Sequence, residues 1–219
     1  MYLFVTTKCN LACMHCCHNC RPGRGQHMPA DVFEHVCRYL DRHSPTDVVF
    51  GGGEPTLHPD LLPMLETAIR VSRRSVFMIT NGTCSTDLWK KLVKVRGLDL
   101  QVSDGPMYAD SIVPQNSFVM NSAAQRGMRW NSGYDHHIEI ELTGRAVRNQ
   151  KAIEHRVRER GWHVEFQPGL DSEICVLPNG HVCAWGSGGV YKEFGLLSAR
   201  ECDRAEMFAY GRKRRHGLA

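Results

Sequence analysis

The feature that most restricts the fold of this chain is a regular alternation of short apolar segments with longer amphipathic ones. Four short segments are rich in β-branched and aromatic side chains, as strands are: residues 2–7, 47–53, 75–82 and 98–105. Three segments between them carry apolar side chains at helical spacing: residues 28–43, 59–74 and 85–95. Repeated strand–helix units of this kind favour an α/β fold with a parallel sheet, either open or curled into a barrel.

The middle of the chain continues this alternation less regularly. Residues 105–136 show no clear unit beyond a predicted strand at 117–122. A strand at 137–144, a helix at 145–161 and a strand at 162–168 are predicted to follow. We therefore expect the strand–helix pattern to resume after an interruption.

The composition changes after about residue 169, which divides the chain into two predicted regions, 1–169 and 170–219. Residues 174–185 predict a hairpin, because two short apolar runs flank a Pro-Asn-Gly turn sequence. We expect a loop at 186–195 and a terminal helix at 198–215 that runs into a basic tail.

Composition and charge exclude several classes of protein. A chain of 219 residues with 42% hydrophobic and 23% charged side chains is expected to fold as one large domain or two small ones. A net charge of +4 is too small to indicate nucleic-acid binding by itself. The first residues are too short an apolar run for a targeting signal, and no run approaches the length of a membrane span. Ten cysteines then favour metal ligands in a reducing, cytoplasmic setting over disulfides.

Five of the cysteines lie within twelve positions, directly after the first predicted strand. Cys9, Cys13 and Cys16 form a C-x3-C-x2-C pattern. Three thiolates on one loop can hold three corners of a cubane iron–sulfur cluster and leave one iron open. A structural zinc site requires a fourth ligand, and the donors that follow are Cys17, His18 and Cys20. The loop alone leaves the cluster and the zinc site equally open.

The other chemistry-bearing segments also follow predicted strands. In parallel α/β folds the site lies at the carboxyl ends of the strands. Those ends carry the cysteine loop at residues 8–17, the Gly-Gly-Gly-Glu-Pro turn at 51–55, Thr-Asn-Gly at 80–82 and Ser-Asp-Gly at 103–105. We therefore expect these four segments to form one site.

The sequences CNLACMHC, GGGEPTLHPD, TNG and SDG, in this order, resemble the radical S-adenosylmethionine (radical SAM) superfamily over about residues 2–168. The resemblance implies a partial (β/α)6 TIM-like barrel, here with a small C-terminal hairpin and helix extension. It also implies a 4Fe–4S cluster held by Cys9, Cys13 and Cys16, whose fourth iron binds the amino and carboxylate groups of S-adenosylmethionine. Reductive cleavage of that cofactor gives methionine and a 5′-deoxyadenosyl radical, which abstracts hydrogen from a substrate.

The same resemblance implies which residues meet the cofactor. The main chain of the glycine turn would meet the methionine amino group, and its residues are Gly52, Gly53, Glu54 and Pro55. Five further contacts are expected, from His15, Asn81, Ser103, Asp104 and Arg145. Plainer roles stay open for several of them, since Asn81, Ser103 and Asp104 suit turns or caps and Arg145 suits a solvated helix start.

Cys175 and Cys183 flank the predicted hairpin, and with the later FGLL sequence they resemble the start of a SPASM or shorter twitch extension. Full SPASM domains hold auxiliary clusters on more cysteines than the three that follow residue 170 here, the third being Cys202. Either one auxiliary cluster forms with help from Cys17 or Cys20, or these two are spare thiols and the hairpin holds no metal. The low cysteine count favours the second possibility.

The substrate is less constrained than the cofactor. A short chain leaves a barrel mouth little covered, which suits a peptide or another macromolecule, and the SPASM-like segment favours a peptide. The basic run at 210–217 keeps a nucleotide or nucleic acid as an alternative, although a solvated tail is the favoured explanation of such a run. A non-catalytic zinc protein is the third possibility. The resemblance also implies a flavodoxin- or ferredoxin-like reductant, and no membrane partner is expected.

Overall fold

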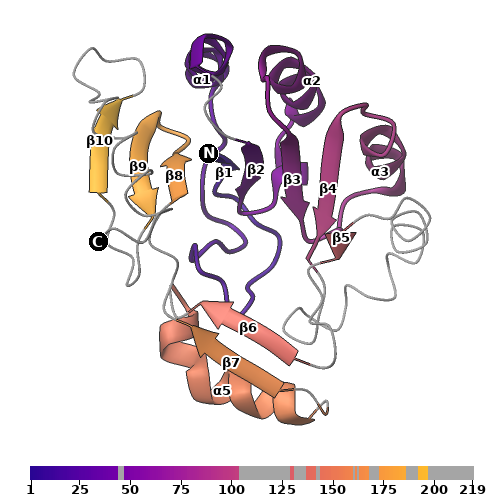
Figure 1. Cartoon of the computed structure of the whole chain (residues 1–219). Coiled ribbons are helices and arrows are strands. Elements are labelled where there is room, and N and C mark those ends of the chain that lie inside the picture. The colour runs from indigo at the N-terminus through magenta and orange to yellow at the C-terminus, as the bar shows by residue number, and fades with distance from the viewer. Residues whose placement is uncertain are drawn as a thin grey trace.

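The computed structural model describes residues 1–43, 47–103, 129–130, 137–141, 144–159, 161, 163–167, 173–185 and 192–196. These residues form a mixed α/β fold with two sheets (Figure 1). The larger sheet has eight strands in the order β10-β9-β8-β1-β2-β3-β4-β5. The smaller sheet pairs β6 with β7 in parallel.

The centre of the larger sheet is parallel. Its strands are β1 (Tyr2–Thr6), β2 (Val48–Gly52), β3 (Val76–Thr80), β4 (Leu98–Val102) and the short β5 (Arg129–Trp130). Each pairs in parallel with the next. The sheet is mostly parallel and does not close on itself, which agrees with the predicted partial barrel.

Helices connect the parallel strands and lie outside the arc that the strands follow (Figure 1). They are α1 (Ala30–His43), α2 (Leu61–Val71) and α3 (Thr86–Leu92), together with the 3₁₀ turn η1 (Pro55–Leu57). α3 begins where the sequence predicts, because Ser85 caps it by accepting a hydrogen bond from the Leu88 amide at 3.3 Å. Among the described residues, no helix is long and apolar enough to cross a lipid bilayer.

The main core lies between the larger sheet and these helices. Strand residues that point toward the helices are fully buried, among them Leu3, Val5, Phe50 and Met78. They pack against the apolar faces of α1, α2 and α3, represented by Leu40, Leu65 and Trp89. Burial of this apolar surface fixes the strand order and hence the position of every strand end.

The C-terminal hairpin is joined to the larger sheet. β8 (Glu173–Val176) and β9 (His181–Trp185) are antiparallel and flank the predicted Pro-Asn-Gly turn. β8 also pairs in parallel with β1, at Tyr2 opposite Cys175 and Leu3 opposite Val176. The boundary predicted between residues 169 and 170 lies outside the described residues, so the division into two regions stays a prediction.

Part of the predicted loop at 186–195 is a strand instead. Residues Lys192–Leu196 form β10, which pairs in antiparallel with β9. The ladder to β9 stabilises this extended segment, and such a partner cannot be read from local sequence. The strand predicted at 117–122 and the helix predicted at 198–215 lie outside the described residues.

The smaller sheet combines β6 (His137–Glu141) and β7 (His163–Gln167) with the helix between them, α5 (Ala146–Glu159). Ala146, Ile153 and Val157 of α5 form a second small core with Val164 of β7. In Figure 1 this unit lies across the open side of the arc, beyond the strand ends of the larger sheet. The long connection after β1 lies between the two.

Candidate functional site: the cysteine loop at the strand ends

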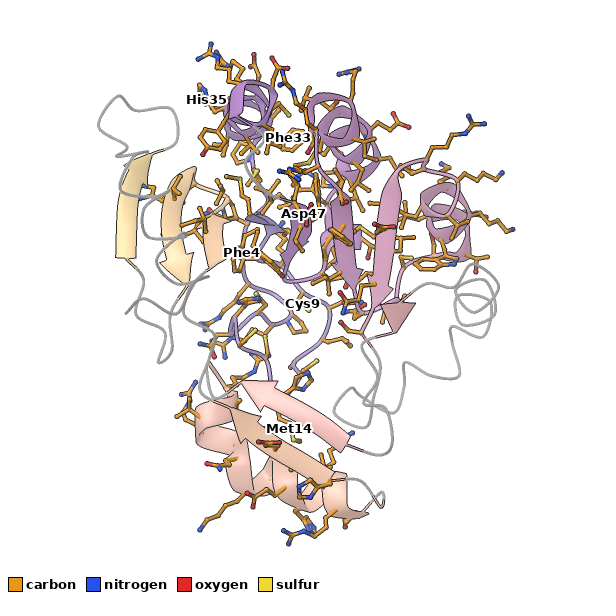
Figure 2. All side chains as sticks on the ribbon, in the orientation of Figure 1. Phe4, Cys9, Met14, Phe33, His35 and Asp47 are labelled. Carbon is orange, nitrogen blue, oxygen red and sulfur yellow. The ribbon has the colours of Figure 1, made fainter. Side chains whose placement is uncertain are left out.

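The cysteine loop leaves the end of β1 and returns to the same strand end. Its base is closed by two hydrogen bonds, from the Thr7 amide to the Gln26 carbonyl at 2.9 Å and from the Met28 amide to the Val5 carbonyl at 2.8 Å. Figure 2 shows Cys9 near the strand ends of the larger sheet and Met14 against the smaller sheet and α5. The loop therefore spans the space between the two units.

The glycine turn after β2 is attached directly to this loop. The Gly53 amide donates to the Thr6 carbonyl and the Glu54 amide donates to the Lys8 carbonyl, each at 2.8 Å. Gly52 has a φ of 118°, which favours glycine. A Cβ added at Gly52 would collide with the Thr6 carbonyl oxygen, and one added at Gly53 would collide with the Lys8 carbonyl oxygen. The glycines are thus required by the close approach of the cysteine loop itself.

The side chain of Glu54 joins the ends of β2 and β3. It is 1% exposed, and its Oε1 accepts from the Thr56 amide at 3.1 Å, the Thr56 hydroxyl at 2.6 Å and the Thr80 hydroxyl at 2.7 Å. Its Oε2 accepts from the Asn81 amide at 2.8 Å. Burial raises the pKa of this carboxyl, while the hydrogen bonds from Thr56, Asn81 and Thr80 oppose that shift. The carboxylate is therefore a structural link between two of the site's turns.

We expect Glu54→Gln to destabilise the fold by about 1–3 kcal/mol, because an amide cannot satisfy this set of donors. One backbone N–H faces each carboxylate oxygen, so the glutamine NH₂ group meets a fixed donor in either orientation. Urea unfolding monitored by circular dichroism measures the loss. Glu66→Gln, on the exposed face of α2, is the matched control and should change stability by less than about 0.5 kcal/mol. Equal stability of the two variants would rule out this role.

A second polar network joins the loop to the end of β3. Asn81 Nδ2 donates to Asn10 Oδ1 at 3.1 Å, and Asn10 Nδ2 donates to the Thr83 hydroxyl at 2.6 Å. Asn81 Oδ1 accepts from both the amide and the hydroxyl of Thr83, at 3.0 and 2.6 Å. The predicted turn role of Asn81 is present together with a contact to the cysteine loop. The sequence patterns do not single out Asn10, although a polar residue directly after the first loop cysteine is an available signal.

The end of β4 is only partly described. Ser103 is buried and its amide donates to the Thr80 carbonyl at 2.8 Å, which extends the β3–β4 ladder by one residue. Asp104 lies outside the described residues. The proposed cofactor contacts of both residues therefore stay predictions.

The thiols of the loop lie close enough to influence one another's ionisation. Burial raises the pKa of Cys9, and it raises that of Cys13 to about 12, with the neighbouring thiols adding to both shifts. The pKa of Cys16 is lowered, mainly by a hydrogen bond from the Cys20 thiol and further by the positive charge of Arg145. Such a group of half-buried thiols favours a bound cation that replaces their protons.

Arg145 lies at the start of α5 and is bonded to this loop. Its amide donates to the Cys16 carbonyl at 3.0 Å, its Nε donates to the Cys13 carbonyl at 2.9 Å, and its Nη2 donates to the Cys20 carbonyl at 2.7 Å. From the sequence, Arg145 was expected either to contact the cofactor or to lie at a solvated helix start. Neither expectation includes these hydrogen bonds to the loop carbonyls. A contact with the cofactor carboxylate stays a prediction.

His15 lies on the same loop, beside the third cysteine of the motif. Burial lowers the pKa of its imidazole to about 4, and the charges of Arg145 and Arg156 add to the shift. The ring is therefore neutral near pH 7, which suits a side chain that packs beside a cofactor. Its proposed cofactor contact is untested.

Comparison with known proteins shows similarity to one superfamily over the first half of the chain. The model of the radical SAM superfamily matches residues 3–104, which include the cysteine motif, the glycine turn and the ends of β3 and β4. The mycofactocin maturase MftC of Mycobacterium tuberculosis is 31% identical over 151 residues, or 65% of this chain and 37% of that protein. The match identifies a radical SAM domain within residues 3–104 of this chain.

Two further similarities were found, one to a curated protein and one to a solved structure. A probable GTP 3′,8-cyclase of Methanothermobacter marburgensis is 27% identical over 84 residues, or 38% of this chain and 28% of that protein. The matches thus span roughly a third of the length of these curated relatives. The solved structure of anSMEcpe with bound AdoMet and Cp18Cys peptide has a TM-score of 0.61 at 13% identity, over 99% of this chain and 81% of that one.

The second cysteine set lies on the opposite face of the sheet from the helices. Cys175 and Cys183 are directly opposed on β8 and β9, and both are buried. Cys17 of the cysteine loop packs with Phe4 and Cys175. Cys202 lies outside the described residues, so its part in an auxiliary site stays a prediction.

Proposed function

We propose that this chain carries the catalytic core of a radical SAM enzyme that abstracts hydrogen from a peptide or another macromolecule. The observation that carries the proposal is the loop of Cys9, Cys13 and Cys16, which lies at the strand ends and is hydrogen-bonded to the glycine turn. When bound there, a 4Fe–4S cluster with S-adenosylmethionine supplies the 5′-deoxyadenosyl radical. In this proposal the three thiolates hold the cluster.

The donor set fits a cluster better than a single ion. Among the described residues, no group of three or more His, Cys, Asp or Glu side chains is arranged to hold one metal ion. A structural zinc ion draws all its sulfurs to about 2.3 Å from one centre, whereas each thiolate of a cubane cluster binds a different iron. Three half-buried thiols on one loop support the second arrangement.

We assign recognition of the cofactor's amino group to the main chain of residues 52–55. The Glu54 carboxylate is already saturated by Thr56, Thr80 and Asn81, so its side chain holds the turn in place. Carbonyl oxygens of the turn are the acceptors that a cationic amine requires.

Two observations support a macromolecular substrate. The relative with the longest match is named a maturase, and one structure with the same fold was solved with a bound peptide. The similarity to a probable GTP cyclase covers fewer residues, and it keeps a nucleotide as the alternative. We also propose a flavodoxin- or ferredoxin-like protein as the electron donor.

Anaerobically reconstituted protein should form 5′-deoxyadenosine when dithionite and S-adenosylmethionine are both added, slowly in the absence of substrate. Liquid chromatography with mass detection measures the product, and samples that lack either reagent are the controls. Product that does not depend on dithionite would contradict reductive cleavage. Faster formation with a candidate peptide than with GTP would favour the peptide, and the reverse order would favour the nucleotide.

A further inference from the structure

A single arginine holds the cysteine loop at three points. The three carbonyls that Arg145 binds belong to Cys13, Cys16 and Cys20, so its bonds span the loop from its second cysteine to its last. Two of these bonds come from different nitrogens of one planar guanidinium. A lysine ammonium carries the same charge but cannot reproduce this fork.

Other contacts from α5 support the same attachment. Asn149 Nδ2 donates to the Met14 carbonyl at 3.0 Å, and the Met14 side chain packs on the small core of α5 (Figure 2). Gly144 has a φ of 53°, and a Cβ there would press on the carbonyls of Cys16 and Cys17. The start of α5 is therefore shaped to the loop, and Arg145 supplies a charged contact with the loop carbonyls.

The guanidinium also acts on the thiols through its charge. Its Nε binds the Cys13 carbonyl and the main-chain amide of Arg145 binds the Cys16 carbonyl, which places the positive charge beside two of the three residues assigned to the cluster. A cluster held by three thiolates gains one negative charge on reduction, so a fixed cation beside it stabilises the reduced form.

We propose that Arg145 is a positioning residue that locks the cysteine loop in its cluster-binding conformation and stabilises the reduced cluster by its charge. The locking role concerns the protein without metal. The second role rests on the proposed function, because it requires a bound cluster. The two roles separate in two variants, since Arg145→Lys removes the fork and keeps the charge, whereas Arg145→Met removes both.

Alkylation of Cys20 in the metal-free full chain tests the lock. Cys20 is 6% exposed, and its own carbonyl is bound by Arg145. Both Arg145 variants lose the hydrogen bond from the guanidinium to the Cys20 carbonyl. We therefore expect iodoacetamide to label the Cys20 thiol about tenfold faster in both variants than in the wild-type chain. Cys37, 9% exposed and on α1, reports global unfolding in the same sample and should keep its rate. Arg148→Met, an exposed change one turn along α5, is the matched control.

The midpoint potential of the iron-loaded chain, titrated with dithionite as the one-electron donor, tests the charge. We expect Arg145→Met to lower the equilibrium constant for reduction about tenfold, which is a shift of about 59 mV, and Arg145→Lys to stay near wild type. A wild-type rate of Cys20 labelling in both variants would contradict the proposed role of Arg145 in holding the loop. A wild-type midpoint potential in Arg145→Met would contradict its proposed electrostatic role. If the wild-type chain takes up no iron, the proposed function fails, while the labelling of Cys20 still decides the lock.

Discussion

Replacing Cys9, Cys13 and Cys16 together by alanine should reduce bound iron and sulfide from about four of each per chain to nearly none. These thiols are the three ligands that we propose for the cluster. Without thiolates the loop offers no anionic donors at those corners. Anaerobic reconstitution followed by colorimetric iron and sulfide assays measures the change. Cys84→Ala, a half-buried thiol outside the loop, should leave both counts unchanged.

The same assay tests the second cysteine set. We expect about four irons in the wild-type chain and no change in a Cys175→Ala, Cys183→Ala double variant, because too few cysteines follow residue 170 for the full SPASM pattern. About eight irons, falling to about four in that double variant, would establish a second cubane at the hairpin. Full iron retained in the triple loop variant would contradict the assignment of Cys9, Cys13 and Cys16.

Gly53→Ala should damage cluster uptake and cofactor binding together. The added methyl group would collide with the Lys8 carbonyl, so the turn and the cysteine loop must move apart and break the two hydrogen bonds between them. Such overpacking costs about 1–3 kcal/mol. We expect a lower denaturation midpoint and loss of most bound iron, measured on the same preparation.

Gly23→Ala is the matched control for this prediction. Gly23 lies in the same long connection after β1, and a Cβ there meets nothing within 4 Å. The φ of 74° at Gly23 still makes alanine unfavourable there, by about 1–2 kcal/mol. This variant therefore shows the effect of backbone strain without a collision. If Gly53→Ala kept normal iron and stability and lost only cofactor affinity, then the ligand would be the group that requires this glycine.

The parallel half of the fold was predictable because its signals are local. β1 to β4 and α1 to α3 each occur within the ranges expected from apolar spacing, and the Pro-Asn-Gly turn joins β8 to β9 as expected. The pairing of β8 with β1 joins residues more than 170 positions apart, and β10 forms only against β9. No local pattern encodes a partner at such a distance.

The position of the cysteine loop and the glycine turn at the strand ends was predictable, and the contacts that support them were not. A motif names Gly53, but only the fold shows that the Lys8 carbonyl is the neighbour that excludes a side chain there. Arg145 follows a predicted strand end, yet its bonds reach a loop 125 residues or more away in sequence. Such contacts depend on how α5 meets the loop, which is a property of the assembled fold.

The central claim is that the Cys9, Cys13 and Cys16 loop binds a cluster with one iron open to S-adenosylmethionine. Electron paramagnetic resonance of the dithionite-reduced wild-type chain, recorded with and without S-adenosylmethionine, tests it most directly. We expect a cluster signal that integrates to about one spin per chain, with g-values that shift when the cofactor is added. A chain that binds about one zinc and no iron, or a cluster signal that the cofactor leaves unchanged, would contradict the claim.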